Sequence, residues 1–178
     1  PAAAKKLGIQ IVYQEVDMAL IPTLTVAENV MFNDLVMNMG HKQFVNYGKI
    51  RKDAKEALAR LNVNIDVRRM CGTLTLAQKQ MVLIARAVQS ACNFLILDEP
   101  TAPLSDTETE ELFRVVRHLR KTENLAVIFI THRIHEVLQI CDSYTVMRNG
   151  EIVDTTPITP KTTSKEIVDK MLGRSFEI

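Results

Sequence analysis

The sequence has little excess charge of either sign and few cysteines. Its 178 residues include 22 Lys and Arg against 21 Asp and Glu, which gives a formal net charge of +1. A broad electropositive face that would hold a polyanion by counterion release is therefore excluded, and we expect no nucleic acid among the partners. The three cysteines, Cys71, Cys92 and Cys141, follow no metal or disulfide spacing, which predicts a reducing cytosolic setting.

Long hydrophobic runs are also missing. No apolar run approaches the roughly 18 residues that a membrane-spanning helix needs, and the N-terminus lacks the layout of a signal peptide. Apolar residues nevertheless make up 47% of the chain, which suits one globular domain with a real core. We therefore expect any membrane association to come through a protein partner.

The first half of the chain predicts one strand followed by helices. GIQIVY, residues 8–13, is rich in β-branched residues and leads directly into Gln14 and Glu15. Thr25 and Glu28 have the spacing of a capping box that begins a helix through VAENVMF, and apolar spacing predicts a second helix over residues 51–61. Residues from about 15 to 92 are therefore expected to be mainly helical.

The second half alternates between strands and helices. NFLIL and LAVIFI are continuous apolar runs, and Ser105 with Glu108 caps a helix between them. This alternation predicts a parallel sheet. After it, Asn149-Gly150 predicts a hairpin turn, and Thr163 with Glu166 predicts a last helix that ends near Gly173.

Two adjacent carboxylates end the first of these apolar strands, in FLILDEPTAPLSD. The carboxyl edge of a parallel sheet is where ligands bind, so Asp98 could hold Mg²⁺ through water and Glu99 could orient or deprotonate an attacking water. The alternative interpretation is an ordinary strand followed by an acidic capped loop.

A histidine follows the second apolar strand, in Thr131-His132-Arg133. If the two strands are parallel neighbours, His132 lies at the same sheet edge and could hydrogen-bond a terminal phosphate. A satisfied surface histidine is the alternative. His132 and His135 also have the spacing of a metal pair, although no third ligand is evident.

A further candidate is the helix start in LTLAQKQMVLIARA, residues 74–87. Thr75 and Gln78 have capping-box spacing, and free amides at a helix N-terminus attract anions. Taken alone, this segment also fits a plain amphipathic helix.

In this order the segments resemble the ABC ATPase family over essentially the whole chain. VYQE resembles the Q-loop, LTLAQKQ the signature, LILDEPTAPLSD the Walker B strand with the D-loop, and THR the switch histidine. TLTVAENV and MLGRSFE are similar to the first of two fused cassettes in bacterial importers of the ribose, galactose and xylose type.

The resemblance implies roles for individual residues. Glu99 would be the general base, Asp98 and Gln14 would serve Mg²⁺ and its waters, and His132 would contact the γ-phosphate of ATP. The signature and D-loop residues would instead act on the nucleotide of an opposing cassette; these are Thr75, Leu76, Ala77, Gln78 and Ser105. Catalysis would then need two cassettes, fused or dimeric.

Two departures from the family pattern stand out. Leu76 and Ala77 replace the two glycines of the usual LSGGQ, which would restrict how closely the backbone approaches a phosphate. No GxxxxGK[ST] loop occurs, because the only GK, Gly48-Lys49, is followed by Ile50. The family places that loop before Gln14, so we expect it and the first core strands to lie outside this chain, which alone would bind ATP weakly.

The resemblance implies an α/β fold with a RecA-like, P-loop NTPase parallel-sheet core and an inserted helical subdomain. We expect residues of about 15–92 to form the subdomain, and 93–178 with 1–14 to form the core. The complete protein would hydrolyse ATP to drive monosaccharide import at the cytoplasmic face of the inner membrane. It would act with transmembrane permease subunits and, indirectly, a periplasmic sugar-binding protein.

Two other functions remain open. One is a soluble ABC ATPase that acts on DNA or ribosomes, against which the near-zero net charge argues. The other is a non-catalytic interaction module, against which the presence of Asp98, Glu99 and His132 argues. The sequence does not identify the sugar.

Overall fold

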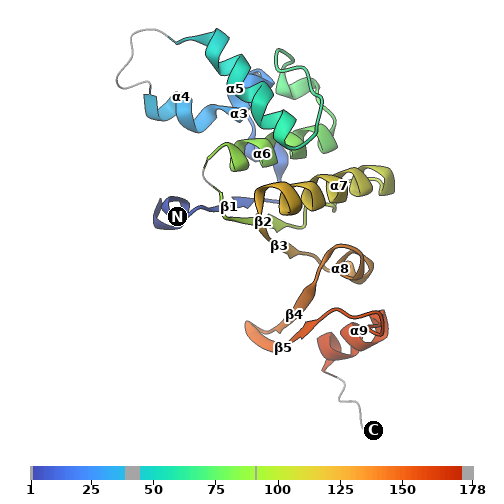
Figure 1. Ribbon diagram of the computed structural model, residues 1–178. Coiled ribbons are helices and arrows are strands. Elements are labelled where there is room, and N and C mark those ends of the chain that lie inside the picture. Colours follow the sequence, from blue (N-terminus) through green and yellow to red (C-terminus); the bar gives the residue numbers. More distant parts are fainter. Residues whose placement is uncertain (1, 39–44, 91, 174–178) are drawn as a thin grey trace. The chain divides into compact units, whose positions relative to one another are not determined.

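Three parallel strands form the sheet that organises the first part of the chain. The computed structural model describes residues 2–38, 45–90 and 92–173. The strands are β1 (Ile9–Val12), β2 (Phe94–Asp98) and β3 (Ala126–Ile130), in the order β1-β2-β3 (Figure 1). Val12 pairs with Leu97, and Leu97 pairs with Phe129. The predicted α/β fold with a parallel sheet is confirmed, including the neighbouring positions of the two apolar strands.

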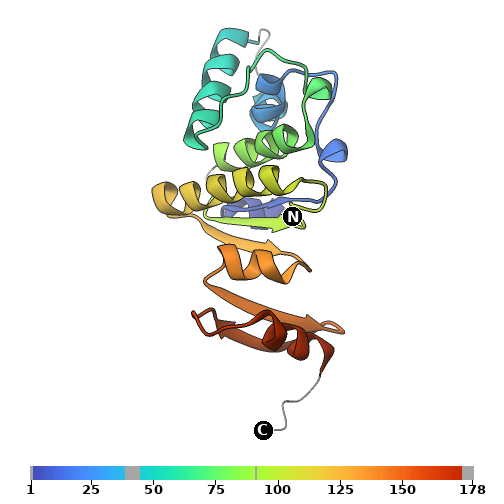
Figure 2. The same cartoon turned by 90° about the vertical axis from the view of Figure 1, so that its right-hand side faces the viewer.

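One face of this sheet is covered by two helices, α6 (Leu76–Gln89) and α7 (Asp106–Glu123), which lie on the same side of it (Figures 1 and 2). Leu95 and Leu97 point to this side and are fully buried. Phe113 of α7 meets Phe129 of β3 edge to face, with ring centroids 5.8 Å apart. The buried face is therefore fixed by the alternation of side chains along each strand.

The opposite face of the sheet carries apolar side chains that stay exposed. The exposed fractions are 39% for Ile11, 46% for Phe94, 51% for Ile128 and 45% for Ile130. Ile11 and Ile128 both pair with Ile96 of the central strand, so they share one row across the sheet. This row is a candidate surface for self-association.

Helices fill the chain between β1 and β2. In addition to α6 they are α2 (Val16–Ala19), α3 (Val26–Val30), α4 (Phe32–Asn38), α5 (Tyr47–Arg60) and the 3₁₀ turn η1 (Cys71–Thr73), and α1 (Ala2–Lys6) precedes β1. The helices α3, α5 and α6 pack around fully buried Val26, Leu58 and Ile84. The predicted helix through VAENVMF is broken at Met31, whose φ of −91° and ψ of 14° end α3 before α4 begins.

The chain divides into two compact units, Pro1–Ile130 and Thr131–Ile178. The second unit contains α8 (Ile134–Ile140), β4 (Ser143–Arg148), β5 (Glu151–Pro157) and α9 (Ser164–Leu172). Its strands pair antiparallel, and its core contains Tyr144, Val146 and Ile167. The predicted division into a helical subdomain and a core stays a prediction.

Local signals in the second unit are confirmed. Asn149 and Gly150 have φ of 53° and 82° and form the predicted hairpin turn. The Thr163 side chain accepts a hydrogen bond from the Glu166 N–H, and α9 ends at Gly173 in the left-handed conformation. Of the MLGRSFE segment, residues 174–177 lie outside the described residues.

Three capping boxes form as the spacing predicts. They join Thr25 with Glu28, Thr75 with Gln78 and Ser105 with Glu108.

In the stretches of chain that the structure describes, no helix has both the length and the apolar content needed to cross a membrane.

Candidate functional site

The end of β2 places two carboxylates at the carboxyl edge of the sheet. Asp98 is the last residue of the strand and pairs with Ile130, the last residue of β3. Glu99 follows immediately, and both side chains are half-buried. A pair of carboxylates at this edge could hold a cation and orient a water.

Glu99 has a backbone conformation that is unusual for a residue with a side chain. Its φ is 44°, in the left-handed region. Its N–H donates a hydrogen bond to the Ile130 carbonyl at 2.9 Å, and its own carbonyl accepts one from the Ala102 N–H at 3.2 Å. The following Pro100 and Thr101 are buried. Strain of this kind costs of the order of 1–3 kcal/mol and clusters at functional sites, so it marks Glu99 in particular.

Gln14 lies beyond the end of the neighbouring strand. β1 ends at Val12, which pairs with Leu97, so Gln14 continues past the same sheet edge as Glu99. Its side chain is exposed, and its carbonyl accepts a hydrogen bond from the Val16 N–H at 3.1 Å. The register thus brings Gln14 to the edge that carries the two carboxylates.

The start of α6 contains the four residues of the predicted signature. The Thr75 hydroxyl accepts from the Gln78 N–H at 3.2 Å, and the Gln78 side-chain oxygen accepts from the Thr75 N–H at 3.2 Å. Ala77 is buried, whereas Leu76 is 37% exposed. Of the two side chains that stand in place of glycines, only Leu76 therefore projects from the helix start.

A half-buried arginine joins α6 to the segment that follows Gln14. Arg86 donates to the Asn29 carbonyl at 2.6 Å, to the Asn29 side-chain oxygen at 2.9 Å and to the Ala19 carbonyl at 2.8 Å. Its guanidinium also lies 5.4 Å from the centre of the Phe32 ring. Burial lowers the pKa of Arg86 from its ordinary value, and the three acceptors offset part of that desolvation.

The sequence reasoning missed this network. Asn29 is fully buried, and its side chain exchanges hydrogen bonds with the backbone of Ile21 at 2.9 Å in both directions. A second link joins the Lys79 ammonium of α6 to the Asp17 carboxylate of α2 at 2.6 Å. Arg86 is the one charged residue in the apolar run 81–88 of α6, and this was the available signal, because a partly buried cation requires acceptors.

Ser105 begins α7. Its hydroxyl donates to the Glu108 carboxylate at 2.8 Å and accepts from the Glu108 N–H at 3.4 Å. The Ser105 backbone N–H, which donates to the Glu108 carboxylate at 3.0 Å, and then the Ser105 hydroxyl lower the pKa of Glu108 from its ordinary value. Any contact of Ser105 with a nucleotide would therefore be made by a hydroxyl that already caps a helix.

His132 belongs to the second unit, two residues after the end of β3, and its side chain is exposed. The side chains next to it contact Glu136, a fully buried carboxylate of α8. Glu136 accepts a hydrogen bond from the Thr131 hydroxyl at 3.0 Å and one from the Arg133 guanidinium at 3.4 Å. Glu136 therefore accepts hydrogen bonds from the residues on both sides of His132. The sequence reasoning did not single out Glu136.

The predicted alternative of a metal pair at His132 and His135 gains no further ligand. In the part of the chain that the structure describes, no group of three or more His, Cys, Asp or Glu side chains is placed to hold a metal ion. A site that uses Asp98 with Gln14 would supply two protein ligands, which suits Mg²⁺ because that ion keeps waters and binds substrate phosphates.

Comparison with known proteins assigns the family. The sequence profile described as ABC transporter matches residues 2–102, which is more than half of the chain. This chain belongs to the ABC transporter family. The family predicted from the Q-loop, signature, Walker B and switch segments is confirmed.

Curated relatives match nearly all of the chain. The Ribose import ATP-binding protein RbsA of Streptococcus agalactiae is 42% identical over 178 residues, which is 99% of this chain and 35% of that protein. The chain thus spans about a third of the length of the curated relatives that it matches.

Solved structures of ABC transporter proteins share the fold. CbiO1 from Clostridium perfringens, part of the ABC transporter complex cbiONQ, superimposes with a TM-score of 0.73 at 28% identity, over 94% of this chain and 62% of that chain. The dimeric cassette MJ0796 bound to ADP and Pi gives a TM-score of 0.69 at 23% identity, over 89% of this chain and 67% of that chain.

Proposed function

We propose that this chain is part of the ATP-binding subunit of an ABC transporter that hydrolyses ATP to import a monosaccharide of the ribose, galactose or xylose type. The observation that carries the proposal is Glu99, which is held in a left-handed conformation beside Asp98 at the carboxyl edge of the sheet. The 42% identity to a ribose import ATP-binding protein supports the same function.

In this proposal Glu99 is the general base that accepts the proton of the attacking water. Asp98 and Gln14 would hold Mg²⁺ and its waters, and the bound ion would supply positive charge against the phosphates. His132 contacts the terminal phosphate of ATP and stabilises charge that develops there. The fixed backbone of Glu99 and the grip of Glu136 on the His132 segment support these roles, because catalytic groups need restrained positions.

The other predicted site residues are proposed to act across a dimer. Thr75, Leu76, Ala77 and Gln78 face the nucleotide of an opposing cassette, and Ser105 contributes to the same interface. The dimeric MJ0796 cassette, which resembles this chain in fold, supports such an arrangement. The exposed Leu76 keeps the backbone of α6 farther from a phosphate than glycine would, so we expect contact through side chains there.

We further propose that the second cassette is fused or dimeric and that the pair works with transmembrane permease subunits. A periplasmic sugar-binding protein would take part indirectly, and the subunit would sit peripherally on the cytoplasmic face of the membrane. ATP would bind the closed cassette pair more tightly than the open pair, and this difference in affinity would drive the transporter between states.

The test measures Mg-ATP binding and hydrolysis on this chain and on the full product of its gene. In whichever of these two proteins hydrolyses ATP, Glu99→Gln is expected to slow hydrolysis about 10²–10⁴-fold, because a general base contributes about that factor. ATP binding should be kept. Glu110→Gln, an exposed position of α7, is the matched control and should hydrolyse normally. Equal rates for Glu99→Gln and the parent would refute the assigned role.

A further inference from the structure

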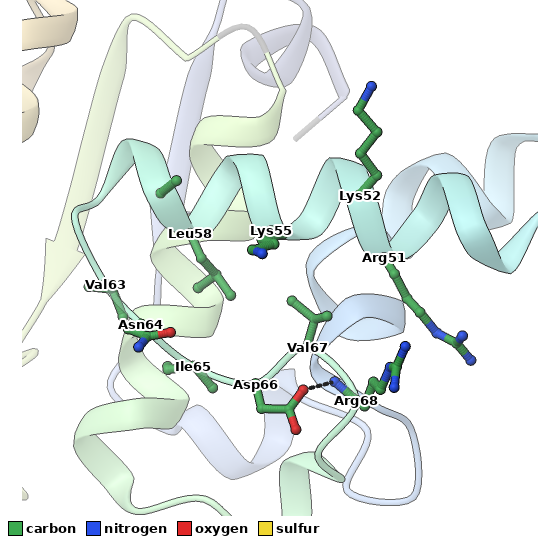
Figure 3. Close-up of a pocket in the computed structure, with 11 residues that line it drawn as sticks. Arg51, Lys52, Lys55, Leu58, Val63, Asn64, Ile65, Asp66, Val67 and Arg68 are labelled. Carbon is green, nitrogen blue, oxygen red and sulfur yellow. Dashed lines mark hydrogen bonds between the residues drawn. The ribbon is translucent and has the colours of Figure 1, made fainter.

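A groove in the helical part of the first unit carries basic side chains that the proposed function does not use. It lies between α5 and residues 63–68 and encloses about 640 Å³ (Figure 3). The facing segment is anchored, because the Val63 N–H donates to the Leu58 carbonyl at 3.1 Å and the Ala27 N–H donates to the Val67 carbonyl at 2.9 Å. The groove is therefore built by fixed backbone on both sides.

Four cationic residues and one acidic residue line this groove. The cations are Arg51, Lys52, Lys55 and Arg68, all exposed, and the acidic residue is Asp66. One Asp66 oxygen already accepts a hydrogen bond from the Arg68 backbone N–H at 3.0 Å. Within the described residues, Arg51, Lys55 and Arg68 have no carboxylate at ion-pair distance. Lys52 lies 3.9 Å from the Glu56 carboxylate, so Arg51, Lys55 and Arg68 give the groove its positive charge in a chain whose net charge is only +1.

Apolar side chains form the floor between these charges. Leu58 and Ile65 are buried, and Val63 and Val67 are half-buried. Figure 3 shows Leu58 and Val67 pointing into the space between helix and loop. A ligand that fits must therefore offer apolar surface as well as negative charge.

The placement of the cations favours an extended ligand over a small anion. Arg51 and Lys55 are one helical turn apart, which separates their backbones by about 6 Å. Arg68 comes from the opposite wall, whereas Lys52 points away from the loop in Figure 3. A single phosphate group would not satisfy charges distributed in this way, but acidic side chains along a peptide would.

We propose that this groove binds an acidic segment of a partner protein. An apolar side chain of that segment rests over Leu58 and Val67, and its carboxylates pair with Arg51, Lys55 and Arg68. None of these residues belongs to the proposed ATP site, so this inference stands or falls independently of the proposed function.

The test uses the whole chain and a fluorescein-labelled peptide of alternating glutamate and leucine, with binding followed by fluorescence anisotropy. The matched probe has glutamine in place of glutamate and is expected not to bind. The variant Lys55→Glu with Arg68→Glu should bind the acidic peptide at least about tenfold more weakly, because two attractive pairs become repulsive. The control variant Lys161→Glu with Lys165→Glu makes the same change of net charge in the second unit and should bind normally.

Circular dichroism checks that each variant folds. If the charge-reversal variant unfolds, the milder variant Arg68→Ala takes its place, and it should weaken binding about threefold. Failure of the acidic peptide to bind the parent chain overturns the proposal. Equal weakening in the Lys161 and Lys165 control overturns it as well, because the attraction would then be non-specific. Displacement of the peptide by tripolyphosphate that depends on Lys55 and Arg68 would instead assign the groove to small anions.

Discussion

The backbone N–H of Glu99 donates a hydrogen bond to the carbonyl oxygen of Ile130 at 2.9 Å, and it does so with Glu99 in a left-handed conformation. This bond joins the residue after β2 to the last residue of β3. The side chain at position 99 is thus fixed relative to the sheet edge at the expense of backbone strain, which glycine alone would avoid.

Glu99→Gly is therefore expected to be more stable than Glu99→Ala. Alanine keeps the steric clash at a φ of 44°, whereas glycine removes it, and the free energy of unfolding should differ by about 1 kcal/mol. Urea denaturation measures this difference. The control is Glu110 in α7, where the order reverses because glycine weakens a helix by about 1 kcal/mol relative to alanine. If the Gly and Ala variants had the same order of stability at positions 99 and 110, backbone strain at Glu99 would be contradicted.

Arg86→Ala should strongly destabilise the first unit. The substitution removes three hydrogen bonds of the guanidinium and leaves the Asn29 and Ala19 carbonyls without that donor, so we expect a loss of about 3 kcal/mol. Arg117→Ala is the control, since Arg117 also lies near a phenylalanine ring, at 5.8 Å, but its side chain is 47% exposed. Denaturation measures both losses. Equal losses in the two variants would mean that the three hydrogen bonds of Arg86 add little to stability.

Glu136 should matter for the segment around His132. Replacement by Gln keeps the size of the side chain but removes its charge, which weakens the bonds to Thr131 and Arg133, and we expect a loss of about 2 kcal/mol. A double-mutant cycle with Thr131→Val isolates the Thr131 bond. Additive losses in that cycle would mean that Glu136 does not stabilise Thr131 through this contact.

Acid should weaken the link between α5 and α7. Arg60 donates two hydrogen bonds to the Glu123 carboxylate, at 3.0 and 2.9 Å, and this lowers the pKa of Glu123 from its ordinary value. The contribution to stability is complete above the pKa of the unfolded state, about 4.3, and it is lost as the pH falls through the lowered value.

Glu123→Gln should accordingly lower stability by about 0.5 kcal/mol at pH 7 and flatten its decline below pH 4.5. Denaturation at several pH values provides the measurement. Glu151→Gln, at an exposed position of β5, removes the same charge and should leave the stability at pH 7 unchanged. If stability depends on pH in the same way for Glu123→Gln and the parent, the Arg60–Glu123 ion pair does not contribute to the acid sensitivity.

The exposed row of the sheet predicts self-association of the chain. Ile128→Thr keeps a β-branched residue on an exposed strand position but makes the surface less apolar, so sedimentation velocity at micromolar concentration should show less oligomer. Val153→Thr, at an exposed site of the β4-β5 hairpin, serves as the control. A parent chain that sediments as a clean monomer would contradict the prediction.

The features that the sequence predicts well are local. Capping boxes such as Thr75 with Gln78 depend on residues three apart, and the Asn149-Gly150 turn depends on two adjacent residues. The carboxyl edge with Asp98 and Glu99 was also predictable, because continuous apolar strands imply a parallel sheet. In these cases the chemistry and its structural cause lie within one short segment.

The features that the sequence reasoning missed depend on distant or conditional contacts. The partners of Arg86 are 57 and 67 residues away, and no periodicity in one helix identifies them. The break at Met31 interrupts a stretch with helical pattern at both ends, so tertiary packing decides it. The left-handed conformation of Glu99 goes against the ordinary preference of its residue type, which is typical of a position constrained by function.

The Arg86 bonds have a mechanical consequence. They join α6 to the end of α2 at Ala19 and to Asn29 of α3, and the Lys79–Asp17 ion pair adds a second link between α6 and α2. Because these contacts join α2 to α6, we expect a displacement of the segment after Gln14 to be transmitted to Leu76 and Gln78 at the start of α6.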